Sequence, residues 1–435
     1  MEIAIAPPSR LEGEITPPGD KSISHRAAIF NAIAQGNATI RSYSPGADCS
    51  STLRCLRSLG VGITEDSQHA TVRVEGAGAA GLREPANVLN AGNSGTTMRL
   101  LAGVLAGQPF FSVITGDSSL RGRPMGRIVK PLQQMGAQIS GRGQGSLAPL
   151  AIRGGNLHGI SYKLPVASAQ VKSALLLAGL FAEGESEIQE PVATRDHTER
   201  MLQAMGAQIA AHGVVVRVQR STLRATDVTI PGDISAAAFW LVAGALHPCA
   251  RIRLKHTGVN PTRTGVLDVL RQMGARITVE NSRYEGGEPV ADITVESSSL
   301  AGTEIGGDII PRLIDEIPVI AVAACMAKGT TVIKDAQELR AKESDRIRTT
   351  VQELRCFGAV LEERPDGMVI HGTGSLKGAR CSSRGDHRLA MSLAVAALVA
   401  RGKSVVQGAQ AASISYPTFW EDLRAVSGLS GEAVA

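Results

Sequence analysis

The sequence predicts an α/β fold of two similar domains, each assembled from three repeated units that bury a helix. The first observation is a helix-ending pattern that recurs about every 70 residues, and the second is a series of Ala-rich helices that recurs in step with it. The third is the length of 435 residues, which exceeds one ordinary domain. Solenoid repeats are usually shorter, so compact domains of three units each are expected.

Five helical patterns end with a leucine that is followed four residues later by a glycine. Glycine readily takes the left-handed backbone conformation that ends a helix. A strand-like alternating segment follows each pattern, and a degraded sixth copy lies at 423–429. Because these helices have charged faces, we expect them on the outside of the domains. The five pairs are Leu56/Gly60, Leu132/Gly136, Leu202/Gly206, Leu270/Gly274 and Leu354/Gly358.

A second series consists of helices that are apolar around most of their circumference, which predicts that they are buried. Each is led by a polar residue able to cap it. A unit therefore consists of a strand, a buried helix, a strand, an outer helix and one or two further strands. The six inner helices are expected to open at Ser22, Asn93, Ser168, Ser235, Asp315 and Asp386.

The halfway mark of the repeat lies at 230–233, just before the fourth inner helix. Residues 3–15 are expected to form strands, and by the phase of the repeat they would complete the C-terminal domain. The expected domains are 20–232 and 1–19 plus 233–435, with the active site in the cleft between them. Two chain crossings, near Asp20 and Gly232, would form a hinge.

Charge and cysteine content exclude several classes of function. Forty-five Lys and Arg against 40 acidic residues, with 3% aromatics, argue against a nucleic-acid surface and favour a small acidic substrate. The six cysteines form no CxxC pair and no metal-ligand cluster with the nine histidines, so reduced thiols and no metal are expected. The chain shows no signal pattern, and no apolar run reaches about 18 residues. We expect a cytoplasmic monomer that binds neither membrane nor nucleic acid.

Lys21, Ser22 and Arg26 lie in or just before the first turn of the first inner helix. Cations at a helix start are unfavourable unless an anion binds there, because the helix dipole is already positive at that end. Several such starts converging would make a strong site for a dianion. For any single arginine, an ion pair with a nearby surface carboxylate explains it equally well. Similar groups recur at 93–96 with Arg99, 168–170 with Lys172, 315–316, 386–388, Arg123, Arg195, Arg263 and 342–346.

Asp315 and Glu343 are the carboxylates expected to carry chemistry. Cations beside both would keep them ionised near neutral pH and suit them to proton transfer. The alternatives are a helix cap for Asp315 and a simple ion pair for Glu343. Three histidines that adjoin basic turns, His25, His197 and His387, are further candidates for an acid, a base or a phosphate contact.

Nine motifs in order together resemble one family. They are GDKSISHRA (19–27), GNSGTTMRL (92–100), RGRPMGR (121–127), ASAQVKSALLLAG (167–179), TRDHTERML (194–202), NPTRTG (260–265), IDEIPVIAVAA (314–324), LRAKESDRI (339–347) and DHRLAMS (386–392). The chain resembles the 5-enolpyruvylshikimate-3-phosphate (EPSP) synthases over nearly its whole length. The ASAQVKS and RDHTER forms are similar to the bacterial class II branch.

The resemblance implies the enolpyruvyl transferase fold, in which each domain holds three βαβαββ units. It also implies transfer of the enolpyruvyl group of phosphoenolpyruvate to the 5-hydroxyl of shikimate 3-phosphate. Phosphate would be released by addition and elimination, without a metal or an organic cofactor. This is a step of aromatic amino-acid biosynthesis (the shikimate pathway) and the target of glyphosate.

The resemblance further implies roles for single residues. Asp315 would take the 5-hydroxyl proton, and Glu343 with Lys21 would serve the methylene carbon or the leaving phosphate. Shikimate 3-phosphate would be held by Lys21, Ser22, Arg26, Ser168, Ala169, Gln170, Arg195, Asp315 and Lys342. Phosphoenolpyruvate would be held by Lys21, Gly95, Arg123, Gln170, Arg346 and Arg388.

Two positions depart from the family pattern. Ile414 stands where many members carry a lysine, so that phosphate contact is absent or is supplied elsewhere. Gly95 stands where glyphosate-tolerant class II members carry alanine, which puts tolerance of this protein in doubt.

Two alternatives stay open at this point. The related UDP-N-acetylglucosamine enolpyruvyl transferases typically have Asn after the first Lys and a loop cysteine in the second unit. This chain has Ser22 there, and no cysteine lies between Cys55 and Cys249. A non-catalytic anion-binding protein on the same scaffold would not require Asp315 and Glu343 beside the cations.

Overall fold

The computed structural model describes residues 1–428, and the chain divides into two compact units. The N-terminal unit consists of Gly19–Ile230 and Tyr284–Glu288, and the C-terminal unit consists of Met1–Pro18, Pro231–Arg283 and the described chain from Pro289 onward. The crossings therefore follow Pro18 and Ile230, beside the expected Asp20 and Gly232.

One segment departs from the expected division, which assigned all of 233–435 to the second domain. The segment Tyr284–Glu288 instead groups with the N-terminal unit. Its contacts give the reason: Glu288 Oε1 lies 2.8 Å from Nδ1 of His197, and Arg200 donates a hydrogen bond to the Gly287 carbonyl at 3.3 Å.

The N-terminal unit contains three four-stranded sheets, in the orders β14–β3–β5–β4, β6–β7–β9–β8 and β10–β11–β13–β12. In each, the first strand lies parallel to the second, which is antiparallel to the third. The strands are β3 (Gln35–Arg41), β4 (Gly62–Asp66), β5 (Thr71–Ala77), β6 (Leu89–Asn90), β7 (Phe111–Thr115), β8 (Gln138–Arg142), β9 (Leu147–Arg153), β10 (Ser161–Lys163), β11 (Ser186–Gln189), β12 (Ile209–His212), β13 (Val215–Val218) and β14 (Val228–Thr229).

The C-terminal unit contains two four-stranded sheets, β2–β15–β17–β16 and β18–β19–β21–β20, and the three-stranded sheet β22–β23–β1. The first two strands of each are again parallel, and the second is antiparallel to the third. The strands are β1 (Glu2–Ile5), β2 (Leu11–Ile15), β15 (Ala250–Gly258), β16 (Arg276–Glu285), β17 (Glu288–Glu296), β18 (Glu304–Ile305), β19 (Lys328–Ile333), β20 (Val360–Arg364), β21 (Gly367–Thr373), β22 (Arg380–Ser382) and β23 (Ser404–Gln407).

The strand that precedes each crossing pairs with a sheet of the unit that the chain leaves there. Strand β2 directly precedes the first inner helix in the sequence, yet it pairs with β15 of the C-terminal unit. Strand β14 precedes the fourth inner helix and pairs with β3 of the N-terminal unit. Strand β1 completes the last sheet beside β23. Residues 3–15 thus contribute β1 and β2 to sheets of the C-terminal unit.

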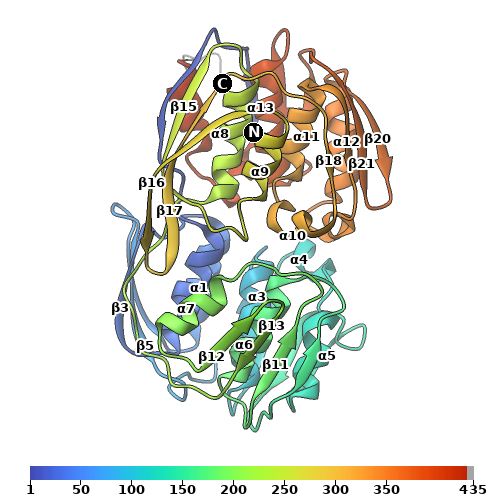
Figure 1. Ribbon diagram of the computed structural model, residues 1–435. Helices are drawn as coiled ribbons and strands as arrows, with labels where there is room; N and C mark the ends of the chain where they lie inside the picture. The colour runs from blue at the N-terminus through green and yellow to red at the C-terminus, as the bar shows by residue number, and fades with distance from the viewer. Residues whose placement is uncertain (429–435) are drawn as a thin grey trace. The chain divides into compact units, whose positions relative to one another are not determined.

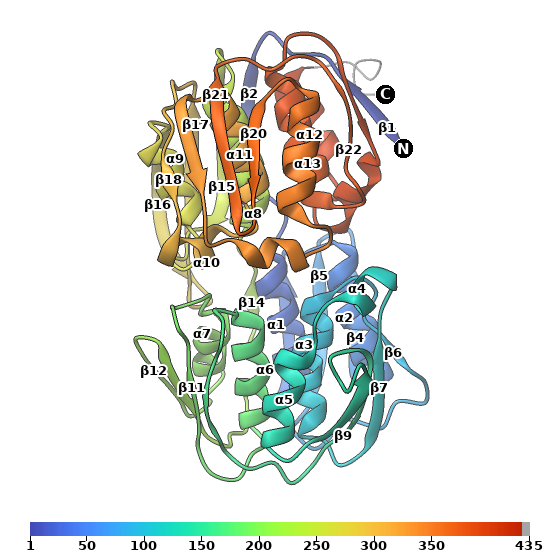
Figure 2. The same cartoon turned by 90° about the vertical axis from the view of Figure 1, so that its right-hand side faces the viewer.

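Six inner helices form the cores of the units. In the C-terminal unit α8, α11 and α13 contact one another, and in the N-terminal unit α3 contacts both α1 and α6 (Figures 1 and 2). Helix α11 begins two residues after the expected Asp315, at Ile317. The inner helices are α1 (Lys21–Ala32), α3 (Gly95–Ala106), α6 (Ala169–Gly179), α8 (Ile234–Leu246), α11 (Ile317–Met326) and α13 (His387–Val399).

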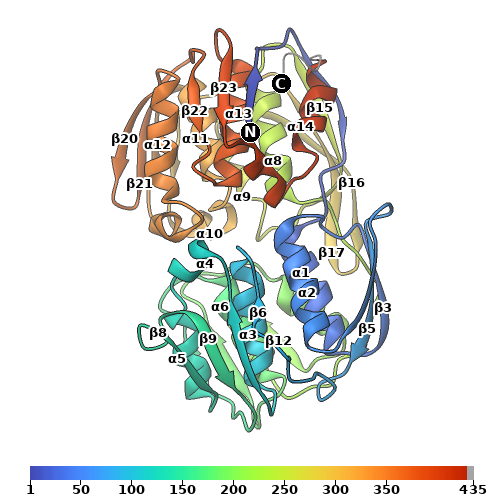
Figure 3. The same ribbon diagram turned by 180° about the vertical axis from the view of Figure 1, so that it is seen from behind.

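Six outer helices each bury one face. Five end at the predicted glycines, whose φ angles are 86° at Gly60, 108° at Gly136, 88° at Gly206, 100° at Gly274 and 78° at Gly358. The sixth copy is α14, whose C-cap Gly428 has φ 61°, while Leu429 lies outside the described residues. The outer helices are α2 (Ala47–Ser58), α5 (Gly126–Gln134), α7 (His197–Ala204), α9 (Gly265–Gln272), α12 (Arg346–Cys356) and α14 (Phe419–Ser427), several of which are best seen in Figure 3.

Short helical turns complete the description. They are α4 (Ser118–Gly122), α10 (Ile310–Leu313), η1 (Gly307–Ile309), η2 (Gln337–Ala341) and η3 (Ala409–Ile414). Within residues 1–428, no helix has the length and apolar character needed to cross a membrane.

Candidate active site

Arg346 organises the charged groups of the C-terminal unit. It is the first residue of α12, and its guanidinium group is almost completely buried. Nε donates to Oδ2 of Asp386 at 2.8 Å, Nη1 donates to Oδ1 of Asp315 at 3.1 Å, and Nη2 donates to Oε2 of Glu343 at 2.7 Å. One guanidinium group thus orients three carboxylates, which come from three separate parts of the sequence.

The charges in this cluster stabilise one another. Burial disfavours the charge of Arg346, but the carboxylates of Asp386, Glu343 and Asp315 outweigh burial and raise the pKa of Arg346. Burial also opposes the charge of Asp386, yet Arg346 lowers the pKa of Asp386 below its ordinary value. Arg346 and Asp386 therefore form a buried ion pair, and Arg346 also binds Asp315 and Glu343.

Asp315 binds cations and does not act as a helix cap. Its Oδ1 accepts hydrogen bonds from Nζ of Lys342 at 3.2 Å and from Nη1 of Arg346 at 3.1 Å. The N-cap position of α11 belongs to Glu316, and no side chain caps that helix. The side chains of Asp315 and Glu343 stay 13% and 16% exposed, so both can reach a bound molecule.

Arg388 lies in a second buried group of the same unit. Its Nη1 lies 3.5 Å from Oε1 of Glu316, which also accepts a hydrogen bond from the Ser235 hydroxyl. Arg263 donates to the same hydroxyl at 2.5 Å and lies 3.6 Å from Asp233. The starts of α8, α11 and α13 therefore share one network of cations and carboxylates.

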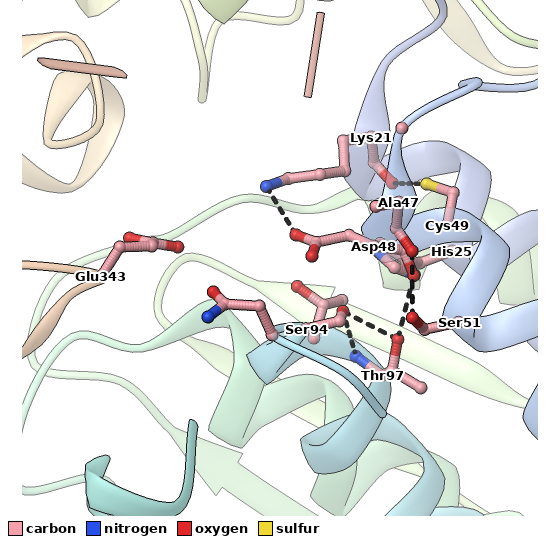
Figure 4. Close-up of polar contacts among 12 residues, drawn as sticks. Lys21, His25, Ala47, Asp48, Cys49, Ser51, Ser94, Thr97 and Glu343 are labelled. Carbon is pink, nitrogen blue, oxygen red and sulfur yellow. Dashed lines mark hydrogen bonds and ion pairs between the residues drawn. The ribbon is translucent and has the colours of Figure 1, made fainter. Parts of the chain in front are cut away.

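Lys21 is the first residue of α1 in the N-terminal unit. Asp20 caps this helix by accepting a hydrogen bond from the Ile23 amide at 2.9 Å. Lys21 Nζ donates to Oδ2 of Asp48 at 3.0 Å, and Figure 4 shows the two side chains pointing toward one another. Asp48 lies in the first turn of α2 and belongs to no motif, so sequence analysis missed it.

Arg26 is buried and joins three elements. Nη1 donates to the Ser22 carbonyl at 2.9 Å, Nε donates to Thr198 at 2.7 Å, and Nη2 donates to Ser173 at 2.7 Å. Burial lowers the pKa of Arg26 to about 10, partly offset by the nearby carboxylate of Glu199. These contacts place the starts of α1, α6 and α7 side by side. A guanidinium group has five N–H donors, so these three bonds are compatible with a further bond from Arg26 to a substrate.

Gln170 connects α6 with α3. Its Nε2 donates to Oγ1 of Thr96 at 2.9 Å, and its Oε1 accepts a hydrogen bond from Arg99. A Cβ atom added to Gly95 would lie 2.9 Å from Nη1 of Arg99 and 3.6 Å from Nη1 of Arg123. Gly95 thus lies beside two guanidinium groups.

Of the remaining predicted residues of this unit, Ser168 and Ala169 lie at the start of α6, whereas Arg123 is the C-cap residue of α4 and not at the start of an outer helix. Arg123 Nη2 donates to Oδ1 of Asn93 at 2.6 Å and to the Ser119 hydroxyl at 3.2 Å. Ser168 is the N-cap residue of α6 without a side-chain cap bond, and Ala169 begins that helix. Arg195 lies close enough to Arg26 for its charge to lower the pKa of Arg26.

The three candidate histidines are buried. His25 Nδ1 lies 2.6 Å from Oγ1 of Thr52, and burial, with Lys21 and Arg26 adding to it, lowers the pKa of His25 well below 6.5. His197 pairs with Glu288, and His387 is fully buried at the start of α13. Burial argues against a phosphate contact for these side chains.

The His25 contact continues as a chain of hydroxyl groups. Thr52 Oγ1 lies 2.7 Å from Thr97 Oγ1, which donates to Oγ of Ser94 at 2.7 Å. Ser94 caps α3 by accepting from the Thr97 amide, as Figure 4 shows. This buried chain connects α1, α2 and α3, and its last member, Ser94, directly precedes Gly95 in the sequence. No single motif revealed it, because its members come from three helices.

Within residues 1–428, no group of three or more His, Cys, Asp and Glu side chains is arranged to hold a metal ion. The charged groups around Arg346 and Lys21 are instead paired cations and carboxylates. Such groups can bind anions and move protons.

Comparisons with known proteins agree on one family. A family model described as EPSP synthase (3-phosphoshikimate 1-carboxyvinyltransferase) matches residues 5–423. A protein of Herpetosiphon aurantiacus named 3-phosphoshikimate 1-carboxyvinyltransferase is 55% identical over 425 residues, covering 97% of this chain and 98% of that protein. A protein of the same name from Bacillus thuringiensis subsp. konkukian is 55% identical over 415 residues, covering 95% and 96%.

Solved structures give the same result. EPSP synthase from Acinetobacter baumannii matches with a TM-score of 0.87 and 44% identity over 98% of each chain. The enolpyruvyl transferase NikO from Streptomyces tendae matches with a TM-score of 0.80 at 18% identity, covering 98% of this chain and 97% of NikO, which supports the fold alone. The predicted enolpyruvyl transferase fold is confirmed, and the chain belongs to the EPSP synthase (3-phosphoshikimate 1-carboxyvinyltransferase) family.

Proposed function

We propose that this transferase moves the enolpyruvyl group of phosphoenolpyruvate to the 5-hydroxyl of shikimate 3-phosphate and releases phosphate. The observation that carries the proposal is the cluster in which Lys342 and Arg346 bind Asp315 while Arg346 also binds Glu343. Ionised carboxylates held beside cations suit proton transfer next to anionic substrates. Family membership supports the same reaction.

The reaction would proceed by addition and then elimination. In the addition, the 5-oxygen bonds to C2 of phosphoenolpyruvate, its proton passes to Asp315, and a proton adds to the methylene carbon. In the elimination, the bond from C2 to the phosphate oxygen breaks, phosphate leaves, and the new methyl group loses a proton. Glu343 and Lys21 would exchange the protons at the methylene carbon and the leaving phosphate. Charges and atoms balance without an oxidant or a reductant.

The anionic groups of the substrates require the cations of both units. Shikimate 3-phosphate would be held by Lys21, Ser22, Arg26, Ser168, Ala169, Gln170, Arg195, Asp315 and Lys342. Phosphoenolpyruvate would be held by Lys21, Gly95, Arg123, Gln170, Arg346 and Arg388. Helix starts that carry arginine and lysine are favourable places for phosphate and carboxylate groups.

Because these ligands belong to both units, we propose that the active site is shared between the two domains and that shikimate 3-phosphate favours a closed state. Small-angle scattering with and without saturating shikimate 3-phosphate tests this proposal. A smaller radius of gyration is expected on binding, and identical scattering curves would contradict it.

We further propose that the enzyme acts in the cytoplasm as a monomer. The six cysteines are free thiols, which suits a reducing compartment. Light scattering during size-exclusion chromatography tests the oligomeric state, for which one chain mass of 45.3 kDa is expected.

The deciding experiment is an assay of phosphate release with both substrates. Release is expected only when phosphoenolpyruvate and shikimate 3-phosphate are present together. UDP-N-acetylglucosamine replaces shikimate 3-phosphate in the control, and release with that acceptor instead would favour the alternative transferase, which the comparisons do not favour. Binding of both substrates without any phosphate release would favour a non-catalytic protein.

A further inference from the structure

Arg340 lies two residues before Lys342, and its side chain donates four of the described hydrogen bonds. It belongs to the short helix η2, and its side chain is 29% exposed. Nε donates to the Pro365 carbonyl at 2.7 Å and Nη2 donates to the Arg364 carbonyl at 2.6 Å. Nη1 donates to Oδ2 of Asp345 at 2.8 Å and to Oε1 of Glu363 at 2.9 Å.

The bond to Asp345 closes a loop around the proposed site residues. Lys342, Glu343 and Ser344 all lie between Arg340 and Asp345 in the sequence. Asp345 also caps α12, because its Oδ1 accepts a hydrogen bond from the Arg348 amide at 3.1 Å. Arg340 therefore joins both ends of the loop to the start of the helix that carries Arg346.

The other bonds of Arg340 fasten this loop to the hairpin of β20 and β21. The hairpin turn also holds the segment before η2, because Asp366 accepts hydrogen bonds from the Asp335 amide at 2.8 Å and from the Ala336 amide at 2.7 Å. The segment that leads into Lys342 is thus bonded to one turn at both of its ends. The planar guanidinium group fits the two adjacent carbonyl groups and the two carboxylates together, which a lysine ammonium group cannot do.

We propose that Arg340 is a positioning residue that holds Lys342 and Glu343 in their reactive geometry. The inference rests on the proposed function, in which Glu343 exchanges a proton and Lys342 binds shikimate 3-phosphate. Arg340 itself touches no residue assigned to a substrate in the described hydrogen bonds and ion pairs, so it acts through the loop. A shift of about 1 Å in a reacting group can lower a rate on the order of a hundredfold.

The alternative is that Arg340 merely stabilises the hairpin. Partly exposed ion pairs contribute little to stability, so Arg340→Met should leave a folded enzyme. Arg364 provides a matched control, because it lies in the same hairpin and its side chain donates to Glu362 at 2.7 Å, whereas only its backbone carbonyl accepts a bond from Arg340. Arg364→Met removes an arginine and an ion pair but leaves the loop contacts of the Arg340 side chain in place.

The kinetic test measures kcat and both KM values for Arg340→Met, Arg340→Lys and Arg364→Met. For Arg340→Met, kcat is expected to fall about tenfold or more and KM for shikimate 3-phosphate to rise, with a smaller change in KM for phosphoenolpyruvate. Arg340→Lys should recover little, because lysine lacks the planar fork. Equal losses in Arg340→Met and Arg364→Met would overturn the inference.

Mutational coupling separates positioning from general stability. If Arg340 acts through Glu343, Arg340→Met should lower kcat by less than about threefold in a Glu343→Gln background, where that carboxylate is already lost. A full tenfold loss in that background, as independent effects predict, would overturn the role through Glu343.

Amide hydrogen exchange tests the loop without relying on activity. Arg340→Met should speed exchange in a peptide spanning 342–344, while Arg364→Met should not. Unchanged exchange in Arg340→Met would overturn the inference. A wild-type enzyme without phosphate release would overturn the proposed function, and the exchange result would still decide whether Arg340 orders the loop.

Discussion

Nε of Arg346 donates to Oδ2 of Asp386 at 2.8 Å, and both side chains are buried. Asp386 also caps α13 by accepting a hydrogen bond from the Arg388 amide at 2.9 Å, so its carboxylate cannot rotate freely. This contact fixes the plane of the Arg346 guanidinium group. Its other nitrogens consequently face Asp315 and Glu343.

Asp315→Asn should separate catalysis from binding. Asparagine keeps the shape of the side chain and an oxygen for Lys342 and Arg346, but it cannot accept the hydroxyl proton. We expect kcat to fall about a hundredfold or more, while shikimate 3-phosphate still binds. Steady-state kinetics and calorimetric titration measure the two effects. Near-normal kcat with a lower melting temperature would show that Asp315 is structural.

Gly95→Ala should weaken inhibition by glyphosate more than it weakens binding of phosphoenolpyruvate. The new Cβ would lie 2.9 Å from Nη1 of Arg99, the far end of a flexible side chain, so the protein should fold while the space beside Arg123 narrows. Because glycine leaves this space open, glyphosate should inhibit the wild-type enzyme.

Inhibition constants for glyphosate and KM for phosphoenolpyruvate check this prediction. Gly122→Ala is the matched control, because a Cβ there meets no atom within 4 Å. A wild-type enzyme indifferent to millimolar glyphosate would place the control of tolerance elsewhere, with Ile414 as the first position to test.

The thiols should be dispensable for the reaction. Burial raises the pKa of Cys55 to about 11 and that of Cys325 to about 12, whereas Cys249 and Cys356 are exposed. Alkylation near neutral pH should therefore label the exposed Cys249 first, and Cys356 more slowly because burial and Glu353 raise the pKa of Cys356, and it should leave activity intact. Mass spectrometry of the labelled, active enzyme checks this. Inactivation that substrate prevents would contradict it, with Cys49 beside the Lys21 carbonyl as the suspect.

His25 should contribute a pH dependence to stability. Burial holds the pKa of His25 well below 6.5 in the folded protein, whereas the unfolded chain binds a proton near the ordinary value. The unfolded state therefore binds more protons below about pH 6.5, so this contribution to the free energy of unfolding is present above that pH and is lost as the pH falls toward the folded pKa.

Replacing His25 removes this dependence. The free energy of unfolding of the wild type, minus that of His25→Asn, should be higher at about pH 7.5 than at about pH 5.5, by up to about 1.4 kcal/mol. Urea unfolding at both pH values measures it. Parallel pH dependences for the two proteins would mean that His25 titrates normally.

Local patterns in the sequence determined the elements of this protein. Apolar residues around a whole helix predicted α8 and α13, and glycines such as Gly60 and Gly274 marked the ends of outer helices. These features depend on the period of the helix and on the backbone freedom of one residue, which neighbouring residues settle. The repeat phase also assigned residues 3–15 to the C-terminal unit, because each sheet needs the same strand positions.

Only the tertiary structure decided which charges meet. Asp48 pairs with Lys21 across 27 residues, and Asp386 pairs with Arg346 across 40. Asp315 likewise accepts a hydrogen bond from Lys342, 27 residues away, while Glu316 holds the N-cap position of α11. An ion pair forms between side chains that packing brings within about 4 Å, and no local period encodes that distance. The sequence by itself therefore determined the repeats, the inner-helix starts to within two residues and the set of candidate residues, and the packing of those helices decided how the candidates are paired.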